Sequence, residues 1–145
     1  MKKITAFTVA ALMIGGIAFT SCKKYEEGPA LTILTKKARV AGTWEVEAYL
    51  VDGVDKTSDY RAFITSESLE FTKDGTYNTS TTTVLGTDTD AGTWEFVNDK
   101  EDLKTLSNDA GSTPDTMMIV KLKNKEMWVR SKTGTPVYEL HYKAK

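Results

Sequence analysis

Residues that could support catalysis or bind a metal are few in this sequence. It contains one histidine, His141, and one cysteine, Cys22. Zinc sites need several histidine or cysteine ligands close together, and a serine or threonine nucleophile needs a base that is held by a third group. Because His141 is the sole imidazole and no nucleophile-bearing motif is present, the sequence predicts no metal site, no cofactor and no enzymatic activity.

The acidic residues also fall short of a pattern that does chemistry. Residues 52–55 and 88–90 form two acidic turns, and neither supplies the roughly six to eight oxygen ligands that calcium requires. Glu45 and Glu95 have the side chains of a glycosidase pair. Each of them alternates with a large ring, so both are expected on the opposite, solvated face of their strands.

Cys22 follows a segment that is typical of a secretory signal. Residues 1–3, Met-Lys-Lys, give a positive start, and residues 4–20 form an apolar run without a charge. This run is short for a transmembrane span of ~20 residues, so a signal peptide over residues 1–21 is the favoured interpretation. Residues 19–22, Phe-Thr-Ser-Cys, resemble the lipobox of bacterial lipoproteins. The resemblance implies that the cysteine is acylated, for example with palmitate, and anchors the mature chain to a membrane.

Residues 22–35 are expected to form a lipidated N-terminus and a flexible linker, because they combine charges with Gly28 and Pro29. Residues 22–27 resemble the signals that carry lipoproteins to the outer face of the outer membrane in some Gram-negative bacteria. A solvated linker would look similar, so the periplasmic and the cell-surface face both stay open. The chain carries 19 basic and 20 acidic residues without a basic cluster, which argues against nucleic-acid binding.

One hexapeptide occurs twice. Residues 41–46 read Ala-Gly-Thr-Trp-Glu-Val, and residues 91–96 read Ala-Gly-Thr-Trp-Glu-Phe. The similarity stops at the ends of the hexapeptide, so it indicates two strands that open in the same way and not a solenoid of repeats. Each copy is expected to bury a large ring, Trp44 in the first strand and Trp94 in the second.

Alternation of apolar and polar residues predicts eight strands between turn signals. They are expected at residues 43–50, 68–72, 76–83, 92–97, 103–107, 116–122, 126–131 and 137–143. Thr35 is expected to cap a short helix over residues 36–41. Residues 86–90 are interpreted as a turn, and Tyr60 and Phe63 are expected to fold over an open end. Short, regularly spaced strands without a long helix indicate an antiparallel barrel or sandwich.

The order of these parts resembles the lipocalin-like lipoproteins of Gram-negative, gut-type bacteria. The likeness spans residues 36–145 and includes Gly-Thr-Trp at residues 42–44, a Lys-Asp-Gly hairpin and the second Gly-Thr-Trp-Glu. It implies an all-β, eight-stranded antiparallel up-and-down barrel with a short N-terminal helix. In lipocalins an arginine packs across the tryptophan at the closed end, and Arg130 is the candidate. In this strand order the first and fourth strands run oppositely, which predicts Trp44 and Trp94 at opposite ends.

Two kinds of binding remain as interpretations. The first is a small apolar or amphipathic ligand inside the barrel. The second is a role as a protein-interaction or structural subunit of a cell-surface outer-membrane complex, through the outer face. The expected interior or ligand-binding residues are Trp44, Val46, Phe71, Tyr77, Trp94, Phe96, Met118, Tyr138 and Tyr142. The expected partner surface consists of Tyr49, Ile119 and Trp128, and His141 is expected to be an exposed strand residue.

Overall fold

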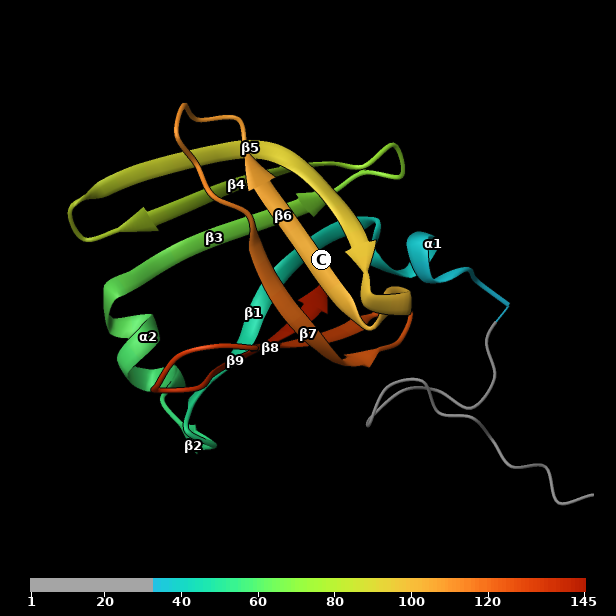
Figure 1. The fold of residues 1–145 in the computed structure, drawn as a ribbon. Helices are drawn as coiled ribbons and strands as arrows, with labels where there is room; N and C mark the ends of the chain where they lie inside the picture. The colour runs from blue at the N-terminus through green and yellow to red at the C-terminus, as the bar shows by residue number, and fades with distance from the viewer. Residues whose placement is uncertain (1–32) are drawn as a thin grey trace, which may run out of the picture.

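The structure, a computed structural model, describes residues 33–145. The predicted signal peptide (residues 1–21), the predicted acylation site Cys22 and the linker as far as residue 32 lie outside the described residues. Over the described range, no helix combines the length and the apolar character that crossing a membrane would demand. This part of the chain is an all-β domain with two short α-helices and a 3-10 helix, η1 (Asn98–Lys100) (Figure 1).

Eight strands close into an antiparallel barrel, as the resemblance to lipocalin-like proteins implies (Figure 1). They are β1 (Gly42–Val51), β3 (Ile64–Phe71), β4 (Thr76–Thr83), β5 (Gly86–Val97), β6 (Asp102–Ser107), β7 (Asp115–Leu122), β8 (Glu126–Ser131) and β9 (Tyr138–Ala144). Each strand pairs with the next barrel strand along the chain, and β9 pairs back with β1, which closes the sheet on itself. A short extra strand, β2 (Val54–Asp55), forms a hairpin with the end of β1.

A short helix, α1 (Lys36–Val40), precedes β1 and lies at one end of the barrel (Figure 1). Thr35 caps it, because its Oγ1 accepts a hydrogen bond from the Ala38 amide at 3.1 Å. This is the helix and the cap that the sequence predicts.

Side chains from α1 and β1 fill this end of the barrel, which we call the closed end. Trp44 is 1% exposed, and its Nε1 donates to the carbonyl oxygen of Val40 at 2.8 Å. Arg39, also buried, donates from Nη1 to the carbonyl oxygen of Leu122 at the end of β7, at 2.5 Å. The arginine at the closed end is therefore Arg39 and not the expected Arg130, which lies on the outside of β8.

Trp94 packs at the same end as Trp44, so the prediction of opposite ends is wrong. The first residue of β1 pairs with Phe71, and the ring of Phe71 meets the ring of Trp94 edge-on with 5.5 Å between centroids. The cause is the length of β5, which begins at Gly86 where a turn is expected over residues 86–90. Trp94 therefore lies near the end of its strand, and that end coincides with the start of β1.

A β-bulge in β1 reverses the face expected for Tyr49. The register with β9 shifts between Val46 and Ala48, which places one extra residue in β1. Beyond the shift, Tyr49 pairs with Leu140, whose side chain lines the barrel interior. Tyr49 thus points inward, and its expected place on a partner surface is corrected.

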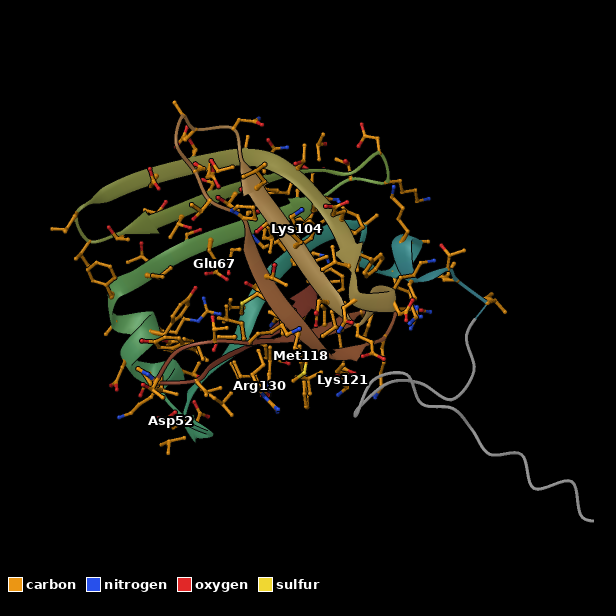
Figure 2. All side chains as sticks on the ribbon, in the orientation of Figure 1. Asp52, Glu67, Lys104, Met118, Lys121 and Arg130 are labelled. Atoms are coloured by element: carbon orange, nitrogen blue, oxygen red, sulfur yellow. The ribbon has the colours of Figure 1, made fainter. Side chains whose placement is uncertain are left out.

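A second bulge in β7 reverses the faces expected for Met118 and Ile119. The register with β8 shifts between Ile119 and Lys121. Before the shift, Ile119 pairs with the inward Val129 and is 3% exposed, whereas Met118 pairs with Arg130 on the outside. Figure 2 shows Met118, Lys121 and Arg130 projecting from the outside of the barrel wall. Met118 is therefore not an interior residue, and Ile119 is not a surface residue.

The opposite end of the barrel carries the second helix, α2 (Thr57–Phe63), between β2 and β3 (Figure 1). Here β1 and β3 diverge: only the first three residues of β1 pair with β3. Farther along, the Val46 amide donates to Oε1 of Glu67 at 2.7 Å, and Arg61 of α2 donates to the Val46 carbonyl oxygen. Glu67 extends from β3 into the barrel (Figure 2). Two side chains thus replace a backbone pairing between β1 and β3.

Candidate ligand-binding cavity

A cavity of about 250 Å³ lies inside the barrel. Every barrel strand except β1 contributes to its lining, and the lining residues alternate along each strand, as inward positions of a barrel do. They are Leu69, Phe71, Tyr77, Thr79, Asp90, Leu103, Thr105, Asp115, Met117, Met127, Val129, Leu140 and Tyr142. The lining is therefore mainly apolar and aromatic. Apart from the hydroxyls of its two tyrosines, its polar side chains are two threonines and two aspartates.

A chain of aromatic rings runs from the cavity lining, which includes Phe71 and Tyr77, into the adjoining core, which includes Trp94 and Phe96. Phe71 lies 6.3 Å from Tyr77 and 5.5 Å from Trp94 between ring centroids, and Trp94 meets Phe96 edge-on at 5.5 Å. The Trp94 indole is fixed because its Nε1 donates to the carbonyl oxygen of Thr72 at 3.0 Å. Such edge-on and tilted arrangements are favourable for aromatic pairs, so the core rings support the Phe71 and Tyr77 side of the cavity.

Asp90 is a firmly held polar group of the lining. Its Oδ1 accepts a hydrogen bond from the Ser107 hydroxyl and its Oδ2 one from the Tyr77 hydroxyl, both at 2.6 Å. These hydrogen bonds lower the pKa of Asp90 below its ordinary value. Burial, together with the hydrogen bond to Asp90, raises the pKa of Tyr77 to about 12. At neutral pH the carboxylate is charged and the phenol is neutral.

A second polar group lies under α2. The Tyr60 hydroxyl donates to Oε2 of Glu67, and the Tyr60 ring lies 5.1 Å from the ring of Tyr49. Burial, and then the hydrogen bond to Glu67, raise the pKa of Tyr60 far above its ordinary value, and burial does the same for Tyr142. Both phenols are therefore neutral hydrogen-bonding groups. Tyr60 folds over this end of the barrel, as the sequence predicts, while Phe63 stays 50% exposed.

The residues expected in the interior occupy four different places. Those that line the cavity are Phe71, Tyr77 and Tyr142. Those that lie inside the barrel without bounding the cavity are Trp44, Val46, Trp94 and Phe96. Tyr138 is 40% exposed at the end of the barrel, where its ring stacks on that of Tyr49, and Met118 lies outside. The cavity is thus smaller and more polar than the expected set implies.

The expected interior set omits ten of the thirteen lining residues, among them Asp90, Asp115 and Met117. The prediction of a turn at residues 86–90 hides Asp90, although its spacing of two and four residues from Gly92 and Trp94 continues the inward alternation of β5. Asp115 precedes the expected start of its strand by one residue. Met117 alternates with Met118, which is expected inside, so regular alternation predicts Met117 on the outside; the bulge in β7 reverses this and leaves no mark in the sequence.

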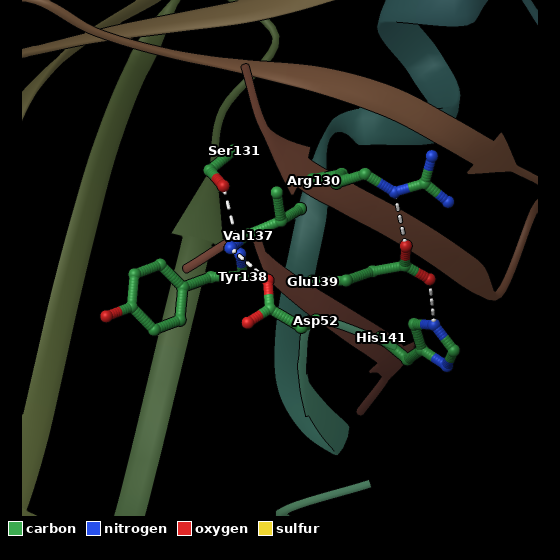
Figure 3. A network of polar contacts seen from close by, with 7 residues as sticks. All are labelled: Asp52, Arg130, Ser131, Val137, Tyr138, Glu139 and His141. Carbon is green, nitrogen blue, oxygen red and sulfur yellow. Dashed lines mark hydrogen bonds and ion pairs between the residues drawn. The ribbon is translucent and has the colours of Figure 1, made fainter. Parts of the chain in front are cut away.

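Trp128 lies on the outer face of β8 and is covered by its neighbours. Its ring stacks on the imidazole of His141 with 3.8 Å between centroids and 5° between planes, and Lys121 Nζ lies 3.8 Å from the ring centroid. Glu139 joins this group, with oxygens 2.6 Å from His141 Nε2 and 2.6 Å from Arg130 Nε (Figure 3). Burial raises the pKa of Glu139, but the hydrogen bonds from His141 and Arg130 outweigh it, so the pKa is lowered overall.

This arrangement alters two expectations about the outer face. His141 is on the outer face, but its side chain is only 15% exposed because Trp128 and Glu139 cover it. Of the expected partner surface, Tyr49 and Ile119 point inward. Trp128 is thus the remaining outer-face member of that set.

Four of the acidic residues that the sequence singles out lie outside the cavity and form local hydrogen bonds or ion pairs. Asp52 Oδ1 accepts a hydrogen bond from a backbone amide next to β9 at 2.8 Å (Figure 3), and Asp55 Oδ1 accepts one from the Thr57 amide at 2.8 Å. Glu45 and Glu95 each form an ion pair with a lysine of a neighbouring strand. Across residues 33–145, no group of three or more histidine, cysteine or acidic side chains is placed to hold a metal ion.

The comparison with known proteins agrees with this architecture. Residues 40–129 match the model of the lipocalin-like domain, a stretch that runs from the end of α1 into β8. No curated protein matches the chain in sequence. The matched residues make up more than half of the chain, and the closed eight-stranded barrel is lipocalin-like. The chain therefore belongs to the lipocalin-like domain family.

Proposed function

We propose that this protein is a membrane-anchored lipoprotein whose barrel binds a small apolar or amphipathic ligand without catalysis. Lipocalin-like domains are generally binding modules and not enzymes. The proposal is supported above all by the interior cavity of about 250 Å³, which combines a wall of aromatic and aliphatic side chains with a few polar groups. Ligand sites in proteins have this same composition.

The size of the cavity favours a small ligand. Sites for drug-sized molecules measure roughly 300–1,000 Å³, so a cavity of about 250 Å³ falls just below that range. Each methylene group that a ligand buries contributes about 0.8 kcal/mol. A short apolar tail therefore supplies several kcal/mol of binding free energy, while the aspartates and threonines orient the polar end.

Tryptophan fluorescence tests this function directly. Trp94 contacts Phe71, which lines the cavity, so an occupied cavity should shift or quench the emission of Trp94. We expect a saturable change with at least one small apolar or amphipathic probe at micromolar concentration. If no probe from a broad panel changes the emission at that concentration, the barrel does not bind such ligands.

A pair of variants locates the response. Thr105 on β6 lines the cavity, so Thr105→Phe should fill it and abolish the probe response. The adjacent Leu106 is 38% exposed on the opposite face of the same strand, so Leu106→Phe adds a similar ring outside and should leave the response intact. An equal response in both variants would show that the probe binds elsewhere.

The proposed anchor is an acylated Cys22. Its support is the sequence: an uncharged apolar run over residues 4–20, a positive start, and Phe-Thr-Ser-Cys at residues 19–22. Cells grown with labelled palmitate should incorporate label into the chain, and Cys22→Ser should remove the label and release the protein from the membrane fraction. Label that persists in Cys22→Ser would contradict acylation at this residue.

We place the anchored barrel on the outer membrane of a Gram-negative bacterium, on its periplasmic or cell-surface face. Residues 22–27, which resemble a surface-export signal, support the cell-surface side. Protease treatment of intact cells distinguishes the two faces. Protease reaches a protein on the cell surface without breakage of the outer membrane, whereas a protein on the periplasmic face is protected.

A second candidate function is binding of an outer-membrane protein partner through the outer face. The observation that favours it is Trp128, a large aromatic residue on the outside of β8, next to Arg130. Aromatic and arginine side chains are common in the centres of protein interfaces. Partner recovery from detergent-solubilised membranes should fall with Trp128→Ala. Identical recovery with both proteins would remove Trp128 from the argument.

A further inference from the structure

We infer that the cavity selects a small amine: a molecule with a protonated ammonium head and a short apolar tail. The inference rests on the proposed ligand-binding function and adds the charge of the ligand. Its basis is the lining, which contains two carboxylates, Asp90 and Asp115, and no lysine, arginine or histidine. An apolar cavity with carboxylates and without basic side chains favours a cation over an anion.

The register of the strands directs both carboxylates toward the cavity. Asp90 on β5 pairs with Thr79 on β4, and Asp115 on β7 pairs with Thr105 on β6. Both threonines line the cavity, and directly paired residues of neighbouring strands project on the same side of a sheet. The two aspartates thus approach the same space from the strands that flank β6.

Asp90 keeps its negative charge and part of its hydrogen-bonding capacity for a ligand. The hydroxyls of Tyr77 and Ser107 donate to it, and both are neutral and do not cancel the charge. A carboxylate can accept about four hydrogen bonds. Because a hydroxyl donates to each oxygen, the group is fixed in orientation, and at least one accepting site remains.

Charge then decides between ligands of equal shape. An ammonium group forms charge-assisted hydrogen bonds with a carboxylate, and these are roughly twice as strong as neutral ones. An alcohol forms only a neutral donor interaction, and a carboxylate ligand is repelled by Asp90 and Asp115. The apolar tail of an amine, an alcohol or a carboxylate ligand would pack in the same way against Leu69, Phe71 and Met127.

The cavity volume sets the length of the probe. About 250 Å³ corresponds to roughly eight water-sized groups at ~30 Å³ each. Hexylamine, which has a six-carbon chain and one nitrogen, fits this volume. Hexan-1-ol and hexanoate have the same tail with a neutral and an anionic head, so the three probes differ in charge and little in shape.

The experiment is isothermal titration calorimetry of the full chain with these three probes at neutral pH. We expect hexylamine to bind about tenfold more tightly than hexan-1-ol, because a charge-assisted hydrogen bond exceeds a neutral one by about 1.4 kcal/mol or more. Hexanoate should bind most weakly of the three.

Two substitutions assign the selectivity to its residues. Asp90→Asn and Asp115→Asn should each lower the affinity for hexylamine by about tenfold and leave that for hexan-1-ol unchanged. Asp115 lies exposed at the start of β7, so its variant tests the inference even if Asp90→Asn disturbs the Tyr77 and Ser107 hydrogen bonds. Asp99→Asn is the charge-matched control, because Asp99 lies in η1 outside the lining and should leave the affinity unchanged.

The outcomes separate this inference from the proposed function. Equal affinities for hexylamine and hexan-1-ol, or unchanged amine affinity in both aspartate variants, would overturn the selectivity and leave ligand binding standing. Absence of binding by all three probes would overturn the inference and also contradict the proposed function for ligands of this size.

Discussion

Replacing Trp44 with alanine should lower the free energy of unfolding by about 4–6 kcal/mol. The Trp44 side chain is 1% exposed and belongs to the core of the closed end. Truncating a large buried ring removes its transfer free energy and leaves a cavity, which together cost about 3–5 kcal/mol. The Val40 carbonyl oxygen also loses the donor that Trp44 Nε1 supplies at 2.8 Å, which adds about 1 kcal/mol.

Urea unfolding followed by far-ultraviolet circular dichroism measures this loss, with linear extrapolation to zero denaturant. Trp128→Ala is the matched control, because it removes the same side chain from the outer face, where the ring is partly exposed and packs on His141. We expect the control to lose about 1–2 kcal/mol. Trp44→Phe keeps a ring in the core but not the hydrogen bond to Val40, so its loss should fall between the two.

The result that would refute the reasoning is a loss below about 2 kcal/mol for Trp44→Ala. Equal losses for Trp44→Ala and Trp128→Ala would refute it as well. Either result would show that the core at the closed end contributes no more to stability than the outer face does.

Three further predictions concern the strands and the cavity. Gly92→Ala should cost about 3 kcal/mol in denaturant unfolding, because a Cβ there would lie 2.1 Å from the Leu106 carbonyl oxygen. The pKa of Tyr77 is raised to about 12 from 10.0, so its contribution to stability is present below pH 10 and lost as the pH rises toward 12. Tyr77→Phe should flatten the stability profile in that window. The pKa of Asp90 is lowered, so its contribution is present above ~3.9 and lost as the pH falls through the folded-state pKa; Asp90→Asn should reduce acid sensitivity in pH-dependent unfolding.

The strand order could be predicted from the sequence because its signals are local. The Lys-Asp-Gly turn at residues 73–75 joins β3 to β4 where it is expected, and Thr35 caps α1. Turn residues and caps act through backbone conformations of a few neighbouring residues. Such signals are readable without knowledge of tertiary contacts.

The faces of β1 and β7 could not be predicted in the same way. Alternation predicts sides correctly only while the register is regular, and one extra residue inverts every position on one side of it. In β1 the inversion turns Tyr49 inward, and in β7 it exchanges the sides of Met118 and Ile119. Each bulge adjoins a continuous apolar run, residues 48–51 in β1 and residues 117–120 in β7, so the sequence there holds no contrast between faces that would reveal the shift.

The repeated hexapeptide shows a related limit. Gly42 begins β1 and has nothing within 4 Å of a built Cβ, whereas Gly92 lies inside β5 beneath the ring of Tyr77. Identical neighbours therefore place the two glycines in different surroundings. The difference comes from the strand that precedes Gly92, which extends back to Gly86 through polar residues that read as a turn.

Side chains of Glu67 and Arg61 take the place of backbone pairing between β1 and β3, and this affects how easily the barrel wall opens locally. A ladder of peptide groups opens only when whole strands separate, but a side-chain hydrogen bond is lost when a single rotamer changes, which takes far less time. Hydrogen–deuterium exchange at the Val46 amide should accordingly speed up in Glu67→Ala, while amides between β4 and β5 keep their protection. Opening of this stretch of the barrel wall thus depends on the conformations of two side chains, Glu67 and Arg61.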